Sequence, residues 1–239
     1  MKKTVLCLVL LFQIPVLVVN QESLNAAPEA KQQPLADLPL VEVPAAGGNS
    51  KVMAIAVTGD GGWGVTDRGI ARGLAAKGIP VVGLNSLHYF WSRKTPEQSA
   101  ADFNRILQYY SALWKRNEIV VVGYSFGAEV LPFMLNRIPA ENQQKIKVIT
   151  LLGPGSAADF QFHFIDWFSS RKRSTSLPVR PEIEKLRGKK ILCFYGTGDE
   201  DELCDKLDPN LAKITPIPGG HRFGRGYQPI VDAILQEVQ

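Results

Sequence analysis

Short apolar runs rich in β-branched residues alternate with longer segments of helical periodicity over most of the chain. The apolar runs are nearly continuous, which is typical of strands buried on both faces of a sheet. An order of strand, helix and strand favours a mostly parallel sheet with helices on both faces, an α/β fold. Strands are predicted at 52–58, 79–84, 119–122, 147–152, 190–195 and 214–217, and helices at 66–77, 96–115, 128–137, 180–186 and 227–238.

The N-terminus has a different pattern. Lys2 and Lys3 precede an apolar run over residues 5–19, and a polar stretch follows as far as Ala26 and Ala27. This is the layout of a secretory signal peptide, and the run is shorter than the roughly 20 apolar residues of a spanning helix. We expect residues 1–26 to be a signal peptide for export to the periplasm, with a membrane anchor as the alternative. Residues 27–39 would form a flexible lead-in and residues 40–239 a single domain.

Composition narrows the class of protein. The chain has 239 residues, a net charge of +4 and 45% hydrophobic residues, as ordinary globular proteins do. The charge is too small to indicate nucleic-acid binding, although it is compatible with work beside anionic lipid. Cys193 and Cys204 lie on either side of a turn, and an oxidising compartment would favour a disulfide between them. Two unpaired buried thiols are the alternative.

The strongest chemical signal is Gly-Tyr-Ser-Phe-Gly at 123–127, between a predicted strand and a predicted helix. A G-x-S-x-G motif in this setting is typical of a nucleophile elbow, in which a sharp turn exposes the serine hydroxyl above the sheet. A serine that merely caps the helix is the alternative. We therefore predict Ser125 to be a nucleophile.

A serine nucleophile needs a base, and the chain has three histidines. His221 follows the last predicted strand, whereas His88 and His163 precede the acidic candidates and would break the chain order Ser, Asp, His of this fold. Asp199, in the acidic turn after the strand 190–195, is the predicted acid that orients the imidazole, and Asp201 is the alternative. A solvated acidic loop is the non-catalytic interpretation of that turn.

The backbone amides of Phe126 and Asp60 are the predicted oxyanion donors, because one follows the nucleophile and the other lies in the glycine-rich loop after the first strand. That loop, 59–64, also matches the G-x-G-x-x-G fingerprint of dinucleotide-binding proteins. The fingerprint requires an acid at the end of the next strand, where this chain has Leu84, Asn85 and Ser86. We therefore expect no cofactor.

Two further features bear on partners. We expect no metal, because no cluster of Cys, His, Asp or Glu has ligand spacing. The segment 160–168 is rich in aromatic residues and precedes three cations at 171–173, as a surface for anionic lipid would. Its alternating start is equally typical of an edge strand.

Four motifs together resemble the VirJ family of bacterial virulence proteins. They are Gly-Asp-Gly-Gly-Trp at 59–63, Tyr-Phe-Trp at 89–91, Gly-Tyr-Ser-Phe-Gly at 123–127 and the cysteine-flanked acidic turn at 193–204. The resemblance implies an α/β-hydrolase fold, a periplasmic location and a link to type IV secretion. It also implies Ser125 as nucleophile, His221 as base and Asp199 or Asp201 as acid. AcvB-like members of the family hydrolyse the aminoacyl ester of lysyl-phosphatidylglycerol, which suggests such a lipid as substrate.

The leading hypothesis is therefore a periplasmic serine hydrolase that cleaves an acyl ester. Asp60 and Glu129 flank the predicted pocket and would suit a cationic aminoacyl group, although either carboxylate would also be ordinary on a surface. A general carboxylesterase or thioesterase is the second hypothesis. The third is a non-catalytic periplasmic factor that binds type IV secretion proteins.

Overall fold

The computed structural model describes residues 35–45, 47–48, 50–161, 176–199, 202–223 and 226–238. The strands are β1 (Leu40–Val43), β2 (Val52–Val57), β3 (Val81–Leu84), β4 (Glu118–Tyr124), β5 (Ile146–Leu152), β6 (Ala157–Ala158), β7 (Leu177–Pro178), β8 (Lys190–Gly196) and β9 (Lys213–Ile217). The helices are α1 (Val65–Ala76), α2 (Ser86–Tyr89), α3 (Pro96–Trp114), α4 (Phe126–Leu135), α5 (Ala140–Lys145), α6 (Arg180–Glu184), α7 (Gln228–Glu237) and the 3₁₀ helix η3 (Cys204–Lys206). The predicted signal peptide lies outside the described residues.

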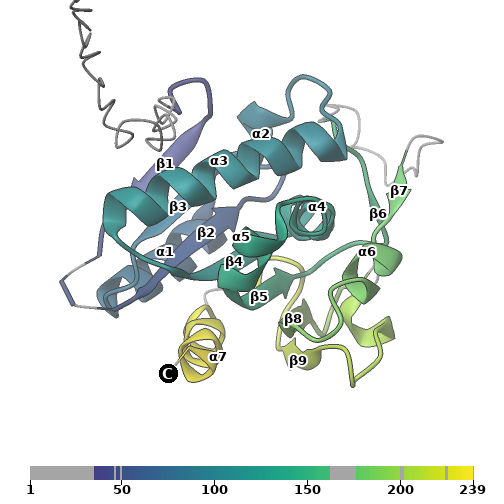
Figure 1. The fold of residues 1–239 in the computed structure, drawn as a ribbon. Coiled ribbons are helices and arrows are strands. Elements are labelled where there is room, and N and C mark those ends of the chain that lie inside the picture. The colour runs from purple at the N-terminus through teal and green to yellow at the C-terminus, as the bar shows by residue number, and fades with distance from the viewer. Residues whose placement is uncertain are drawn as a thin grey trace, which may run out of the picture. The chain divides into compact units, whose positions relative to one another are not determined.

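Seven strands form one sheet in the order β1-β3-β2-β4-β5-β8-β9 (Figure 1). Strand β1 pairs antiparallel with β3, and the other neighbouring strands of this sheet pair in parallel. Parallel strands end at the same edge of a sheet, so the loops that follow β2, β4, β5 and β8 meet there. The predicted α/β-hydrolase fold is confirmed.

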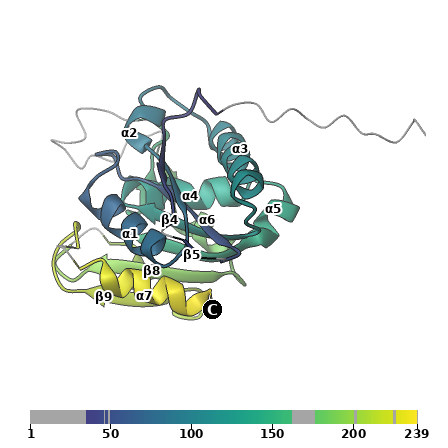
Figure 2. The same cartoon turned by 90° about the vertical axis from the view of Figure 1, so that its left-hand side faces the viewer.

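Helices cover both faces of the sheet. In Figure 2, α1 and α7 lie on one side and α3, α4 and α5 on the other. Alternate residues of β2 serve the two sides, since side chains of a strand point in turn to opposite faces. Met53 and Ile55 join the core beneath α3 and α4, whereas Val52 and Ala54 join the core beneath α1 and α7. The continuous apolar runs in the sequence reflect this two-sided burial.

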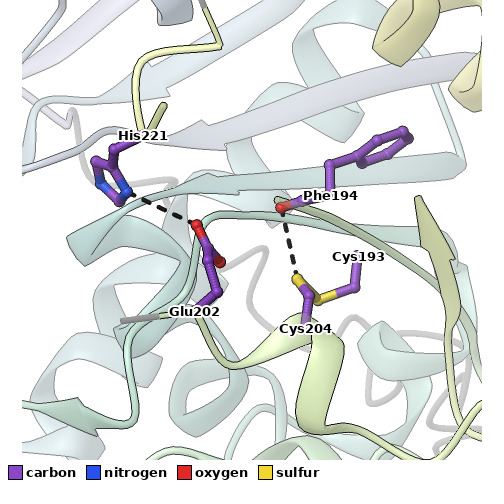
Figure 3. The surroundings of a disulfide bond; sticks show 5 residues. All are labelled: Cys193, Phe194, Glu202, Cys204 and His221. Atoms are coloured by element: carbon purple, nitrogen blue, oxygen red, sulfur yellow. Dashed lines mark hydrogen bonds and ion pairs between the residues drawn. A yellow bond between two sulfur atoms is a disulfide. The ribbon is translucent and has the colours of Figure 1, made fainter. Parts of the chain in front are cut away.

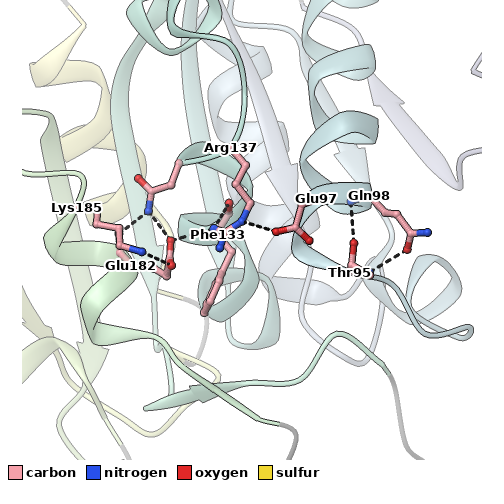
Figure 4. Close-up of polar contacts among 8 residues, drawn as sticks. Thr95, Glu97, Gln98, Phe133, Arg137, Glu182 and Lys185 are labelled. Carbon is pink, nitrogen blue, oxygen red and sulfur yellow. Dashed lines mark hydrogen bonds and ion pairs between the residues drawn. The ribbon is translucent and has the colours of Figure 1, made fainter.

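A buried carboxylate joins three helices on one face of the sheet (Figure 4). Glu182 of α6 has a side chain only 7% exposed, and it pairs with Arg137 at 3.1 Å and Lys185 at 2.7 Å. The Asn136 side chain donates to the same carboxylate at 2.7 Å. Arg137 also pairs with Glu97 of α3 at 3.1 Å. Glu182 thus has the set of partners that a buried charge requires.

Most predicted elements are confirmed within one to three residues, including the five helices and six strands expected from periodicity. The packed part of the chain begins earlier than predicted. Leu35 and Leu38, expected in the flexible lead-in, belong to the core, and Asp37 pairs with Arg105 at 2.8 Å. Two leucines among polar, alanine and proline residues carry no periodic signal, so their burial was not predicted. Across the described ranges, no helix has the length and apolar character needed to cross a membrane.

Candidate active site

Ser125 lies between β4 and α4 in a strained turn. Its φ of 52° and ψ of −121° are unusual for a residue with a side chain. A Cβ added to Gly127 would lie 2.0 Å from the Val57 carbonyl oxygen, and one added to Gly123 would lie 2.7 Å from the Ala128 Cα. Both positions therefore exclude any larger residue. The two glycines let the helix pack directly against the ends of β2 and β4, which presents the serine at the sheet edge.

The three residues predicted from the sequence lie in contact, with His221 between Ser125 and Asp199. His221 follows β9, and its Nε2 lies 2.7 Å from Ser125 Oγ. Its Nδ1 lies 2.5 Å from Asp199 Oδ2, in the loop after β8. The alternative acid, Asp201, lies outside the described residues, as does His163. His88 is exposed on α2.

Tyr124 and Gly153 lie next to the imidazole of His221. The Tyr124 ring lies 5.7 Å from the His221 ring, and the Tyr124 hydroxyl donates to the His221 carbonyl at 3.4 Å. Gly153, at φ 57°, has no side chain, and an added Cβ would lie 3.1 Å from the imidazole. The ring is therefore held between β4 and the loop after β5.

A second carboxylate that sequence analysis missed, Glu202, also faces His221. Its Oε1 lies 3.9 Å from His221 Nδ1, and Figure 3 shows the two side chains directed toward each other. The pKa of His221 is raised, first by Glu202 and then by Asp199, while burial opposes the rise. Glu202 belongs to the acidic turn already singled out in the sequence. Its nearness to the imidazole depends on how that loop folds, so spacing alone could not identify it.

The predicted oxyanion donors belong to two segments that contact the serine. Phe126 is the first residue of α4, and the first amides of a helix have no acceptor within the helix. The loop after β2 also lies close to the serine, since a Cβ added to Gly59 would lie 3.5 Å from Ser125 Cβ. The adjoining Asp60 is half-buried in this loop. The amides of both predicted donors thus belong to segments that meet at Ser125.

The predicted disulfide joins Cys193 of β8 to Cys204 of η3 (Figure 3). Both cysteines are buried, and their Cα atoms are 5.6 Å apart. The bridge closes the loop that carries Asp199 and Glu202, and the Leu203 amide ties the same loop to the Pro154 carbonyl at 3.0 Å. The positions of the Asp199 and Glu202 carboxylates therefore both depend on the short loop that the disulfide closes.

We expect the double substitution Cys193→Ser, Cys204→Ser to lower activity more than folded fraction. The short loop limits the stabilisation from the bridge to roughly 2 to 3 kcal/mol by chain-entropy reasoning. Small displacements of a catalytic group can cost about 10²-fold in rate. Thermal unfolding and ester hydrolysis, measured on the same preparation, would compare the two losses. Equal losses in both would contradict this expectation.

Asp199, Glu202 and His221 also form a group that could hold a metal ion, with ligand atoms within 4.8 Å of one another. Sequence analysis expected no metal because these residues have no characteristic spacing. The imidazole already contacts Ser125 and Asp199 through its two nitrogens. A metal on His221 would compete with these contacts.

A family model described as "VirJ: Bacterial virulence protein (VirJ)" matches residues 51–239 of the chain. No relative was found among curated proteins. The chain is similar in structure to Est1E from Butyrivibrio proteoclasticus, solved with ferulic acid bound, with a TM-score of 0.58 at 14% identity, covering 84% of this chain and 95% of that chain.

Two further solved structures are similar. XC6422 from Xanthomonas campestris, described as a member of a/b serine hydrolase without lid, has a TM-score of 0.53 at 18% identity, covering 83% of this chain and 87% of that chain. A thioesterase domain from the curacin biosynthetic pathway has a TM-score of 0.55 at 14% identity, covering 82% and 94%. At such identities these similarities establish the shared fold.

Proposed function

The chain belongs to the VirJ family of bacterial virulence proteins, and from this premise we propose that it is a serine hydrolase that cleaves an acyl ester. Ser125 would be the nucleophile, His221 the base and Asp199 the acid. The observation that carries the proposal is the continuous contact of Ser125 Oγ with His221 Nε2 at 2.7 Å and of His221 Nδ1 with Asp199 at 2.5 Å. A nucleophile, a base and an orienting acid in this order are what acyl transfer needs.

The geometry gives each group a step. His221 Nε2 takes the proton of the Ser125 hydroxyl as Oγ bonds to the ester carbonyl carbon, and Asp199 balances the imidazolium that forms. The backbone amides of Phe126 and Asp60 would stabilise the oxyanion. The imidazolium then returns its proton to the leaving alcohol, which leaves an acyl group on Ser125. Water, deprotonated by the same imidazole, attacks the acyl carbon of this acyl-enzyme. The bond from that carbon to Ser125 Oγ then breaks, and the imidazolium returns its proton to Oγ, which releases the acid and restores the serine.

We further propose an aminoacylated phospholipid, such as lysyl-phosphatidylglycerol, as the substrate in the periplasm. The family resemblance suggests this lipid, and two carboxylates near Ser125 support it. Glu129 lies one helical turn beyond Ser125 on α4, and its carboxylate accepts a hydrogen bond from the Gly155 amide at 3.2 Å. Asp60 follows Gly59, where an added Cβ would lie 3.5 Å from Ser125 Cβ. A cationic aminoacyl group held at Ser125 would therefore have carboxylates on two neighbouring segments.

A general carboxylesterase or thioesterase is the second candidate, favoured by the named activity of the similar thioesterase domain. The two substrates can be distinguished by charge. The Glu129→Gln variant should hydrolyse lysyl-phosphatidylglycerol more slowly while leaving an uncharged short-chain ester nearly unaffected. An equal effect on both esters would favour the general esterase.

Labelling with a fluorophosphonate tests whether the chain is an enzyme at all. The reagent bonds to a serine only when that hydroxyl is activated, so the folded wild type should label and the Ser125→Ala variant should not. The Ser111→Ala variant is a matched control, since Ser111 lies on α3 and contacts Met53 rather than the site. A folded wild type that does not label would contradict the proposal and favour a non-catalytic factor that binds type IV secretion proteins.

A further inference from the structure

Glu202 is a buried carboxylate in an unusual position. It is only 3% exposed, and within the described part of the chain neither of its carboxylate oxygens has a hydrogen-bond partner. Buried polar groups are normally paired, and Glu182 in the same protein shows the usual case with three partners. The position of Glu202 therefore requires an explanation.

The surroundings hold this carboxylate against the imidazole. The Leu203 amide donates to the Pro154 carbonyl and the disulfide at Cys204 follows directly, so the backbone immediately after Glu202 is held in place. Gly153 leaves the space in which the two side chains meet, since a Cβ there would lie 3.1 Å from His221 and 3.2 Å from Glu202 Oε1. Among the described residues, the Glu202 carboxylate faces His221 Nδ1 at 3.9 Å.

We propose that Glu202 is a positioning residue that acts through His221, as a second negative charge facing the imidazolium formed during catalysis. This inference rests on the proposed function, in which His221 takes the serine proton. A distance of 3.9 Å is too long for a hydrogen bond, so Asp199 keeps the role of direct acceptor. The contribution of Glu202 is electrostatic, and its burial makes that contribution stronger than at a surface.

The Glu202 carboxylate would affect the reaction rate because the positive charge on His221 develops during the reaction. In the proposed mechanism the base is the neutral imidazole, which becomes positive when it takes the Ser125 proton. A fixed negative charge beside Nδ1 therefore stabilises the transition state more than the ground state, which is the condition for accelerating a reaction.

The titratable and charged groups around the imidazole determine how activity is expected to depend on pH. Asp199 and Glu202 face it from the loop after β8, Tyr124 lies beside it on β4, and Arg222 follows it in the chain with an exposed side chain. Burial, opposed by the contact with His221 and assisted by Asp199, raises the pKa of Glu202. Glu202 and Asp199 in turn raise the pKa of His221, against the effect of burial.

The sign of the effect follows from these charges. Only the neutral imidazole can take the serine proton, so activity falls as the pH drops through the pKa of His221. Removing the charge of Glu202 should lower that pKa. The acid limb of the pH profile of kcat/KM should then move to lower pH, while the rate on the plateau falls.

The Glu202→Gln variant tests the proposal because glutamine keeps the size and removes the charge. We expect kcat/KM on the plateau to fall about tenfold, less than the 10²–10³ typical when a direct donor to the oxyanion is lost. The acid limb should move to lower pH. The Glu202→Asp variant, which keeps the charge, should retain an acid limb closer to wild type. Asp205→Asn, an exposed change on η3 just after this loop, is the control and should match wild type. A wild-type profile in Glu202→Gln would overturn the proposal.

A measurement independent of turnover separates this inference from the proposed function. The chain has three histidines, so the His221 ring signal can be assigned in an NMR titration. In the inactive Ser125→Ala background, adding Glu202→Gln should lower the pKa of His221. An unchanged titration would reject the role of Glu202 even if Ser125 proves to be the nucleophile. A lowered pKa with full activity in Ser125→Ala would instead reject the proposed function.

Discussion

The Ser125→Ala variant is expected to fold normally and to lose ester hydrolysis by a factor on the order of 10⁴ or more. The substitution removes the atom that would bond to the acyl carbon and leaves the proposed oxyanion amides and the proposed base in place. Only their residual effect on the attack of water would remain. Initial rates with lysyl-phosphatidylglycerol and with an uncharged ester, measured at high enzyme concentration, would quantify the loss.

The Ser125→Ala substitution should remove the hydroxyl without disturbing the surrounding fold. Ser125 already has a Cβ at φ 52°, so alanine adds no new backbone strain. The lost contact is the one from Oγ to His221, while the Ser125 amide still donates to Leu152 at 2.8 Å. Thermal unfolding should therefore be close to wild type. Turnover above one hundredth of wild type in a preparation free of other hydrolases would contradict the assignment of Ser125.

Much of the sheet could be predicted because its central strands are buried on both faces. Such strands appear as apolar runs, and every residue of β2 and β3 is buried. Strand β1 was missed because it lies at the edge, includes the exposed Glu42 and pairs antiparallel. Helix α5 was missed because its sequence, AENQQK, has no apolar periodicity and buries only Asn142. Both elements are positioned by tertiary contacts, which no local pattern records.

Part of the candidate site could likewise be predicted from the sequence, and part could not. The positions of Ser125, Asp199 and His221 could be predicted because each follows a strand, and parallel strands bring such residues to one edge. Glu202 could not be separated from its acidic neighbours on this basis. Its burial results from the short disulfide-closed loop and from the space left by Gly153, which is distant from it in the sequence. A pattern can therefore indicate which strand ends meet, but not which side chain of a loop turns inward.

The Asp199→Asn variant is expected to lower the hydrolytic rate by about 10⁴ through the tautomer of His221. In the proposed mechanism Asp199 accepts the Nδ1 proton across the 2.5 Å contact, which leaves Nε2 free to take the serine proton. An asparagine amide at the same place can donate to Nδ1. The imidazole would then carry its proton on Nε2, where it cannot accept another from Ser125. The shape of the site would be retained while its proton transfer fails.

Comparison with Asp201→Asn makes this result specific to one acid of the turn. Both substitutions remove one negative charge from the same loop, so a general electrostatic effect would lower both rates alike. If Asp199 is the orienting acid, Asp201→Asn should be nearly silent, and Asp199→Asn should lower kcat without weakening substrate binding, because the lost interaction belongs to the transition state. Steady-state kinetics of the two variants at a pH on the wild-type plateau would decide between them. A large loss in Asp201→Asn with a silent Asp199→Asn would transfer the role to Asp201. Two silent variants would mean that another carboxylate orients His221, and Glu202, at 3.9 Å from Nδ1, is the group within reach.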